Sequence, residues 1–543
     1  MLLRDIKIRK AVSDKELILI AGLFITALLA RLPWLWEVPR YIDELQEVNL
    51  AFSIYRGEAL PLHNMARDIG AMHNYILAGI FKMLGPGVYL PRLYVAITSA
   101  ITVVFIYCVG KKLYGKWTGI AAALLLLGNG MHILVTHMAW ANCTTPFFFS
   151  LALLATITAE QEKSGRWLAA SGLLWALTLQ THSSVIIYVL IAALYVLMPR
   201  FREETGIGWK YYLLAAFALT AGYSNMLYYN LVTRGGSIAW LSHKDYAMEA
   251  HPGLASYAVN LQNMFIELIR SISSTYIEYG NLAQYWFQPA FAICFLLFLI
   301  GAFYAVRHRQ TLPIWMIIGS FLIIPWVNQR YLFFLATRYI MPVVLMALLL
   351  MAYGLIQIFC LLYNRWGQKR ISLAAAGLLL MLLTQVQLMA FYGYCWKAAG
   401  TNMSNRLILQ TFNKTSKLSH TDDTVVIVDN NLKVENNPLP ILLTLSEMPY
   451  KLIDSIPPSS SGDSENQFWY NIASNYEGQR IVGVMSADTF SRLRSFMDPQ
   501  AIDSYSCKVT FPPEAEGERK IYVVDMGVQS PSNPVFAVKK QSP

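Results

Sequence analysis

Residues 91–109, PRLYVAITSAITVVFIYCV, form an apolar run in which Arg92 is the only charged side chain. A helix needs about 17 to 25 such residues to cross a bilayer, so this run predicts a membrane-spanning helix. Comparable runs recur up to about residue 391, and we expect eleven spans. They lie at residues 17–36, 91–109, 118–136, 144–159, 167–181, 183–198, 211–229, 289–306, 311–327, 339–361 and 371–391.

The composition of the whole chain agrees with a membrane protein. Of its 543 residues 55% are hydrophobic and only 14% are charged, whereas a soluble domain carries roughly a quarter charged residues. This composition excludes a disordered tail, a coiled coil and a basic nucleic-acid-binding protein, because each needs charge or heptads that the sequence lacks.

The net charge of +10 predicts the orientation of the chain. Cytoplasmic loops retain Lys and Arg, and every second connection between the expected spans is basic. The opposite short connections, around 137–143 and at residue 182, contain neither residue type. We therefore expect a plasma (inner) membrane protein with a cytoplasmic N-terminus and, since eleven is odd, an extracytoplasmic C-terminal part. The basic residues on the cytoplasmic side are Arg4, Lys7, Arg9, Lys10, Lys15, Lys111, Lys112, Lys116, Lys163, Arg166, Arg200, Arg202, Lys210, Arg307, Arg309, Arg365, Lys369 and Arg370.

Two outer connections, residues 37–90 and 230–288, are too long for simple turns. Each contains an amphipathic apolar run, IFKMLGPGVYL (80–90) in the first and NMFIELIRSI (263–272) in the second, which predicts helices lying in the membrane interface. We therefore assign both connections to a membrane-embedded catalytic domain of residues 1–391.

Beyond about residue 392 the composition becomes polar. Three short runs there are typical of strands, TVVIVD (424–429), IVGVMS (481–486) and KIYVVDMGV (520–528). The pattern predicts a small soluble α/β domain over residues 392–543.

Carboxylates are scarce in the apolar part of the chain. None occurs between Asp68 and Glu160, or between Glu278 and Asp422. An ion-coupled transporter normally needs an acid in mid-membrane, so the distribution disfavours coupled transport and leaves a facilitator or flippase open. The carboxylates available for chemistry on the outer face are then those of the first outer loop, which includes Asp43, of the connection 230–288 and of the C-terminal domain.

Asp43 and Glu44 follow the first span, at the start of an amphipathic helical pattern. One interpretation of Asp43 is a helix N-cap, with Gln46 at capping-box distance; the other is a catalytic carboxylate. Adjacent helical residues point about 100° apart, unlike the paired acids of glycosidases, which face each other across the scissile bond. A single carboxylate suffices where the leaving group is a phosphate, whose developing charge needs only cations.

Cations are expected on the same outer face, at Lys82, Arg92 and Arg338. Arginine suits phosphate geometry, although each cation could instead extend toward lipid headgroups. His73 and His182 lie on this face too, as ligands or as hydrogen-bonding residues of the interface. The sequence shows no His or Cys metal spacing. We assign no cofactor and no metal ligand. A divalent cation stays open as an alternative, because one set of carboxylates could supply oxygen ligands. That set is Asp43, Glu44, Glu47 and Asp68.

Four segments resemble a known family. YIDELQEVNLAFSIYRGE (41–58), the stretch from GAMHNY to KKLYG (70–115), LQTHSS (179–184) and TRYIMP (337–342) are similar to the dolichyl-phosphate-mannose-protein mannosyltransferase group. This group is part of the GT-C superfamily, which also includes bacterial aminoarabinose transferases. The resemblance implies a polytopic membrane enzyme that transfers a sugar, usually with inversion, from a polyprenyl-phosphate donor to an acceptor on the outer face.

The resemblance also implies roles for individual residues. Asp43 corresponds to the catalytic acid that deprotonates the acceptor, Glu44 would shape the substrate site, and Arg92 and Arg338 would bind the lipid phosphate. Where relatives often carry paired prolines, this chain has His73 and Asn74. It also lacks an obvious β-trefoil insertion, which favours a bacterial acceptor that is not a protein or is unknown. The class of acceptor, a lipid, a glycan or a protein that offers a hydroxyl or phosphate, stays open. Two alternatives stay open, a glycan ligase or polymerase and a transporter or flippase of lipid-linked sugars.

Overall fold

The computed structural model describes most of the chain. The described residues are 14–243, 254–274, 289–327, 336–366, 369–401, 404–419, 423–430, 432, 438–453, 471–472, 475–476, 478–496, 503–510 and 518–528. The basic residues before Asp14 and part of the loop 230–288 lie outside these ranges.

The chain divides into two compact units. The membrane unit comprises Met1–Leu35, Gly57–Leu77 and Arg92–Tyr394, and the second unit comprises Trp36–Arg56, Ala78–Pro91 and Cys395–Pro543. Part of the first outer loop, including Asp43, is therefore in the same compact unit as the C-terminal domain.

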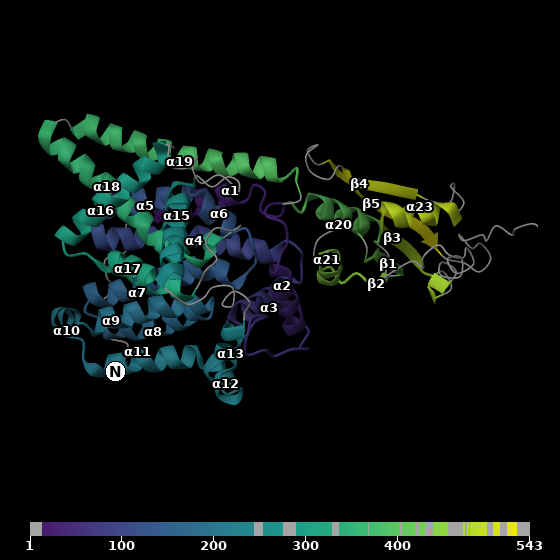
Figure 1. Cartoon of the computed structure of the whole chain (residues 1–543), viewed down its shortest axis with the longest axis horizontal. Coiled ribbons are helices and arrows are strands. Elements are labelled where there is room, and N and C mark those ends of the chain that lie inside the picture. Colours follow the sequence, from purple (N-terminus) through teal and green to yellow (C-terminus); the bar gives the residue numbers. More distant parts are fainter. Residues whose placement is uncertain are drawn as a thin grey trace, which may run out of the picture. The chain divides into compact units, whose positions relative to one another are not determined.

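The membrane unit is helical (Figure 1). Helix α3, Met72–Leu84, begins in this unit and ends in the other. The remaining elements are α1 (Asp14–Arg31), α4 (Leu90–Tyr114), α5 (Lys116–Gly128), α6 (Gly130–Val135), η1 (Ala141–Thr144), α7 (Thr145–Gln161), α8 (Gly165–Leu179), η2 (Ser183–Val185), α9 (Ile186–Leu197), α10 (Pro199–Thr205), α11 (Trp209–Gly222), α12 (Ser224–Val232), α13 (Gly236–His243), α15 (Leu254–Ser273), α16 (Pro289–Arg307), α17 (Leu312–Val327), η4 (Ala336–Tyr339), α18 (Met341–Trp366) and α19 (Lys369–Ala398).

Each expected span contains a helix, but the count of eleven spans is not confirmed. By length and composition, four described helices could cross a membrane, or up to six if each of two bent helix pairs is one span. Helix α5 illustrates the difference: the run expected over 118–136 breaks at Asn129, whose side chain accepts a hydrogen bond from the backbone of His132. The 13 residues of α5 rise only about 20 Å, less than the roughly 30 Å of hydrocarbon in a bilayer.

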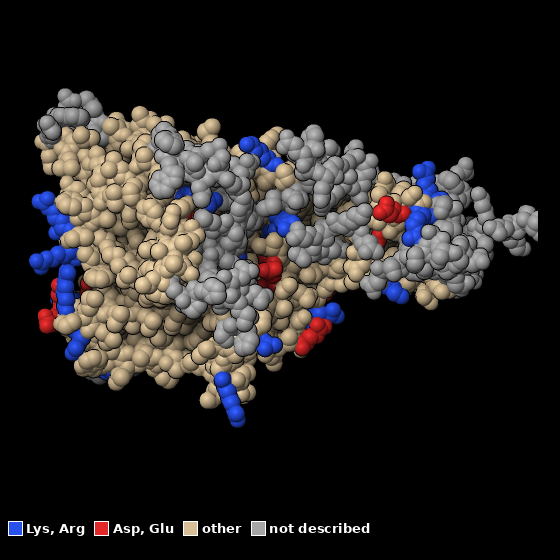
Figure 2. Space-filling model, in the orientation of Figure 1, with Lys and Arg blue, Asp and Glu red and all other residues tan. Residues whose placement is uncertain are grey.

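The core of the membrane unit surrounds α18. Its residues 343–350 are completely buried, and α16 and α17 both pack against it. The approach of α16 requires glycine, because a Cβ on Gly301 would overlap the carbonyl oxygen of Leu350, and one on Gly354 would overlap that of Leu297. Figure 2 shows a surface of mostly uncharged residues on this unit, with Lys and Arg gathered at the end where α10 lies.

The second unit combines helices with a five-stranded sheet of order β2-β1-β3-β5-β4. β1 is parallel to β2 and β3, whereas β5 is antiparallel to β3 and β4. The three strands expected from the sequence are present as β1, β3 and β5. The β1 run is buried throughout, as expected for a parallel strand covered on both faces. The elements are α2 (Glu44–Tyr55), α20 (Arg406–Leu418), β1 (Thr424–Asp429), α21 (Leu439–Leu445), β2 (Tyr450–Ile453), β3 (Arg480–Ser486), α23 (Ala487–Phe496), β4 (Asp503–Thr510) and β5 (Glu518–Val528).

Candidate functional site

Asp43 lies directly before α2, at its N-cap position. Its backbone is already helical, with φ −55° and ψ −15°, and its side chain makes no capping hydrogen bond. The carboxylate is exposed, whereas Glu44 and Glu47 are buried. The interpretation of Asp43 as a side-chain cap is therefore wrong, and its carboxylate oxygens are accessible for other chemistry.

Arg338 is the centre of a cluster in the membrane unit. It lies in η4 and is only 7% exposed. Its guanidinium carbon lies 4.7 Å from the ring centroid of Trp140 and 4.5 Å from that of Tyr339, and Nη2 donates a hydrogen bond of 2.8 Å to the Tyr339 hydroxyl. Cation–π contacts of this kind hold a planar guanidinium in one orientation.

His182 extends the cluster. Its ring centroid lies 5.4 Å from that of Tyr339, and its Nδ1 lies 2.8 Å from the Ser184 hydroxyl oxygen. The adjacent Ser183 donates a hydrogen bond of 2.7 Å to the buried carboxylate of Asp68. The structure thus brings His182 and Arg338 together through Tyr339. The carboxylate of Asp68 is hydrogen-bonded to Ser183, the residue that follows His182.

Arg92 and His73 are buried in the same unit. Nη1 of Arg92 donates a hydrogen bond of 3.0 Å to the carbonyl oxygen of Leu35. Nε2 of His73 lies 3.2 Å from the carbonyl oxygen of Ala139, the residue before Trp140. Burial lowers the pKa of His73 to about 4, although the Ala139 carbonyl raises it, so the imidazole is neutral near pH 7. Lys82, by contrast, is exposed and lies in the second unit.

Glu267 in α15 is a buried carboxylate that was not predicted as part of a site. This carboxylate is 1% exposed, lies 3.1 Å from Nη1 of Arg270 and accepts a hydrogen bond from the Thr337 hydroxyl, next to Arg338. Burial raises the pKa of Glu267 to about 7, while Arg270 and Thr337 act to lower it. The available sequence signal was the Glu-Arg pair three residues apart on an amphipathic helix, a spacing at which side chains meet.

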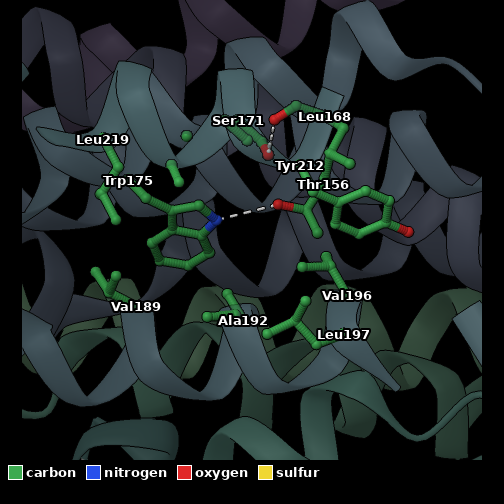
Figure 3. A pocket seen from close by; sticks show the side chains of 14 residues that line it. Thr156, Leu168, Ser171, Trp175, Val189, Ala192, Val196, Leu197, Tyr212 and Leu219 are labelled. Atoms are coloured by element: carbon green, nitrogen blue, oxygen red, sulfur yellow. Dashed lines mark hydrogen bonds between the residues drawn. The ribbon is translucent and has the colours of Figure 1, made fainter. Parts of the chain in front are cut away.

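No site for a metal ion emerges from the described ranges, where no three His, Cys, Asp or Glu side chains are grouped to hold one. A separate cavity of about 170 Å³ lies among α7, α8, α9 and α11 (Figure 3). Its lining is apolar except for a few hydroxyls, and Trp175 Nε1 donates a hydrogen bond of 3.1 Å to Thr156. None of the candidate site residues lines this cavity.

Comparison with solved structures identifies the fold. Over 94% of its length, the chain superposes on 97% of the crystal structure of ArnT from Cupriavidus metallidurans bound to undecaprenyl phosphate, with a TM-score of 0.55 and 14% identity. The apo structure of that protein gives a TM-score of 0.53 at the same identity and coverage. These likenesses show that the chain shares the fold of that protein.

A family model matches part of the sequence. Residues 68–228 match the model of the family described as dolichyl-phosphate-mannose-protein mannosyltransferase, which confirms the resemblance predicted from the sequence. No curated protein shows significant sequence similarity to the chain. Asp68, Arg92 and His182 all lie within the matched residues.

Proposed function

We propose that this chain is a membrane glycosyltransferase that takes a sugar from a polyprenyl-phosphate donor and transfers it to an acceptor on the extracytoplasmic face. The observation that carries the proposal is the buried Arg338, held between two aromatic rings in a chain that matches a mannosyltransferase family. A lipid phosphate suits such a guanidinium, because the two form paired charge-assisted hydrogen bonds. The superposed ArnT structure contains undecaprenyl phosphate, which supports the same class of lipid.

The reaction balances with one base and cations. The acceptor oxygen attacks the anomeric carbon and forms the new glycosidic bond as the bond from that carbon to the phosphate oxygen breaks. The electron pair leaves with the lipid phosphate, whose charge Arg338 and Arg92 stabilise, and Asp43 takes the acceptor proton. This single displacement inverts the anomeric carbon.

The remaining candidates serve substrate binding in this scheme. Buried neutral His73 offers one ring nitrogen to the Ala139 carbonyl, and its other nitrogen has no hydrogen-bond partner among the described residues, so it suits a donor or acceptor hydroxyl. His182 lies beside Tyr339 and suits the sugar-phosphate, while Glu44 and exposed Lys82 contribute to the acceptor side. No metal step is included, because the donor groups that a divalent ion needs are not assembled in the described ranges.

The test compares wild type with Asp43→Asn, using purified protein, radiolabelled polyprenyl-phosphate sugars and membrane extract as the acceptor source. Asp423→Asn is the matched control, because Asp423 is an exposed carboxylate in the same unit. We expect Asp43→Asn to slow transfer by roughly 10²–10⁴-fold, the usual contribution of a general base, with unchanged binding of polyprenyl phosphate.

Each other outcome identifies a different error. Full transfer by Asp43→Asn would show that the base is another group. Movement of lipid between leaflets by the wild type, with no release of sugar from any donor, would show a flippase. Transfer of assembled glycans but never of single sugars would show a ligase.

A further inference from the structure

We infer that Asn405 is a positioning residue through which the C-terminal domain fixes the loop that carries Asp43. The role of Asp43 in this inference rests on the proposed function, whereas the ordering of the loop by Asn405 does not. The inference gives the C-terminal domain a part in the transfer step.

Asn405 is 2% exposed and immediately precedes α20. Its side-chain oxygen accepts a hydrogen bond of 2.6 Å from the backbone amide of Tyr41. Its side-chain nitrogen donates to the carbonyl oxygens of Trp36 and Pro39, at 2.9 and 3.1 Å, and its backbone amide donates to the carbonyl oxygen of Glu37 at 2.7 Å.

This arrangement uses the full chemistry of one carboxamide. The two N–H donors of the Asn405 side chain both have acceptors, and the oxygen has a donor. Aspartate has the same shape but no N–H, so it would present an oxygen to two carbonyl oxygens. Buried carbonyl oxygens that lose their donor, or that face a carboxylate oxygen, destabilise the fold. The conformation of the segment 36–41 therefore depends on the amide group of Asn405.

Further contacts tie the same helix to the outer loop. Arg406 forms an ion pair of 3.1 Å with Glu37, which contributes little because both side chains are about 40% exposed. The Trp36 indole donates a hydrogen bond of 3.2 Å to the carbonyl oxygen of Tyr89, and the Tyr89 hydroxyl donates to Oδ1 of Asn413 at 3.2 Å. Both outer-loop segments of this unit are thus fixed to α20.

The position of Asp43 follows from this clamp. Tyr41, held by Asn405, is two residues before Asp43, and α2 begins at once through the backbone bonds from Leu45 to Ile42 and from Gln46 to Asp43. Because there is no flexible spacer, a shift of the clamped segment moves the carboxylate. A misplacement of about 1 Å can slow a reaction roughly 10²-fold.

The experiment uses the full chain in detergent and compares Asn405→Asp with Asn413→Asp. Both variants replace an amide by a carboxylate of the same shape. Asn405 immediately precedes α20, and Asn413 lies eight positions later within this helix. In Asn413→Asp the oxygen that accepts from Tyr89 is retained, so this variant controls for the added charge. Three quantities are measured: amide hydrogen exchange of residues 36–43, the kcat and KM of transfer, and the Kd for undecaprenyl phosphate.

We expect Asn405→Asp to speed exchange at Tyr41 at least tenfold and to lower kcat at least tenfold. The Kd for the lipid should stay within twofold, and exchange in β1, β3 and β5 should not change. Asn413→Asp should match wild type in every measurement. A residue that acts only in folding would instead change exchange in the strands and in the clamped segment alike.

The inference is overturned if exchange at 36–43 or the kcat of Asn405→Asp remains that of wild type. If Asn405→Asp also loses protection in the strands, Asn405→Ala, which adds no buried charge, is judged by the same two criteria. If Asp43→Asn retains transfer, the proposed base is wrong. Exchange at 36–43 then decides the clamp without reference to the reaction.

Discussion

The proposed binding of lipid phosphate by Arg338 can be tested with a graded series of substitutions. Arg338→Gln removes the buried charge, Arg338→Lys keeps the charge but loses the planar stacking, and Tyr339→Phe keeps the ring but loses the hydroxyl that accepts from Nη2. The three variants separate charge, geometry and orientation of one side chain.

The magnitudes follow from these contacts. A hydrogen bond to a charged group contributes about 1.5–3 kcal/mol, so loss of a bidentate contact in Arg338→Gln should cost about 3–4 kcal/mol, or roughly 100- to 1,000-fold in Kd. A cation–π contact contributes about 0.5–2 kcal/mol, and Arg338→Lys weakens two of them, which corresponds to roughly 5- to 100-fold. Tyr339→Phe removes one hydrogen bond of about 1 kcal/mol, or roughly 5-fold.

The assay is equilibrium binding of radiolabelled undecaprenyl phosphate to the detergent-solubilised protein at constant ionic strength. Arg309→Gln is the control, since this exposed arginine lies in a connection that we expect on the cytoplasmic side. A Kd for Arg338→Gln equal to that of wild type would refute phosphate binding by this residue. Equal binding by Arg338→Lys would refute the contribution of the two rings.

Two further predictions concern stability, each measured by thermal unfolding in detergent. Gly301→Ala should lower the free energy of unfolding by about 1–3 kcal/mol, because its Cβ would overlap the Leu350 carbonyl. The control is Gly377→Ala, at a helical glycine with nothing within 4 Å of the added Cβ, which should be as stable as wild type or slightly more stable. Equal losses of stability in the two variants would contradict the packing argument. The pKa of Glu267, raised to about 7 in the folded chain from about 4.3 when unfolded, means that the folded state binds more protons between these values. Its contribution to stability should therefore fall by up to ~4 kcal/mol as pH rises from about 4 to about 8 and stay constant above. Glu267→Gln should lose this component, and an unchanged pH dependence would argue against the buried carboxylate as its source.

The sequence was most informative where local pattern decides structure. The apolar run at 91–109 became one long helix, because its only proline, Pro91, lies in the first turn, where a helix tolerates proline. The β-rich run at 424–429 contains neither Pro nor Gly and became a buried strand. The break at Asn129 was missed although Gly128 and Gly130 flank it, a pattern typical of a turn. In the structure the Asn129 side chain accepts a hydrogen bond from the backbone amide of His132 and caps the next helix. The span count depends on such breaks and was therefore the least predictable feature.

The contacts that assemble the candidate site join residues far apart in the chain, so the sequence alone could not predict them. Arg338 and His182 were recognisable as an arginine and a histidine at expected span ends, but the rings that hold them belong to Trp140 and Tyr339, whose types also suit membrane anchors. The role of Asn405 could not be recognised in the sequence, because an Asn directly before a helix is typical of an N-cap. In the structure its side chain instead holds a segment more than 360 positions away in the chain.

Burial sharpens the case for Asp43 as the base. The sequence named four acids of the first outer loop as oxygen ligands, with Asp43 as the base, and the structure distinguishes Asp43 from the other three. Glu44, Glu47 and Asp68 are buried, the last accepting a hydrogen bond from Ser183, whereas Asp43 is exposed and does not cap its helix. A general base must reach an acceptor that arrives from outside the protein. Of the four acids, Asp43 alone combines that access with a clamped backbone, so a variant that loosens the clamp should impair transfer while the carboxylate itself is intact.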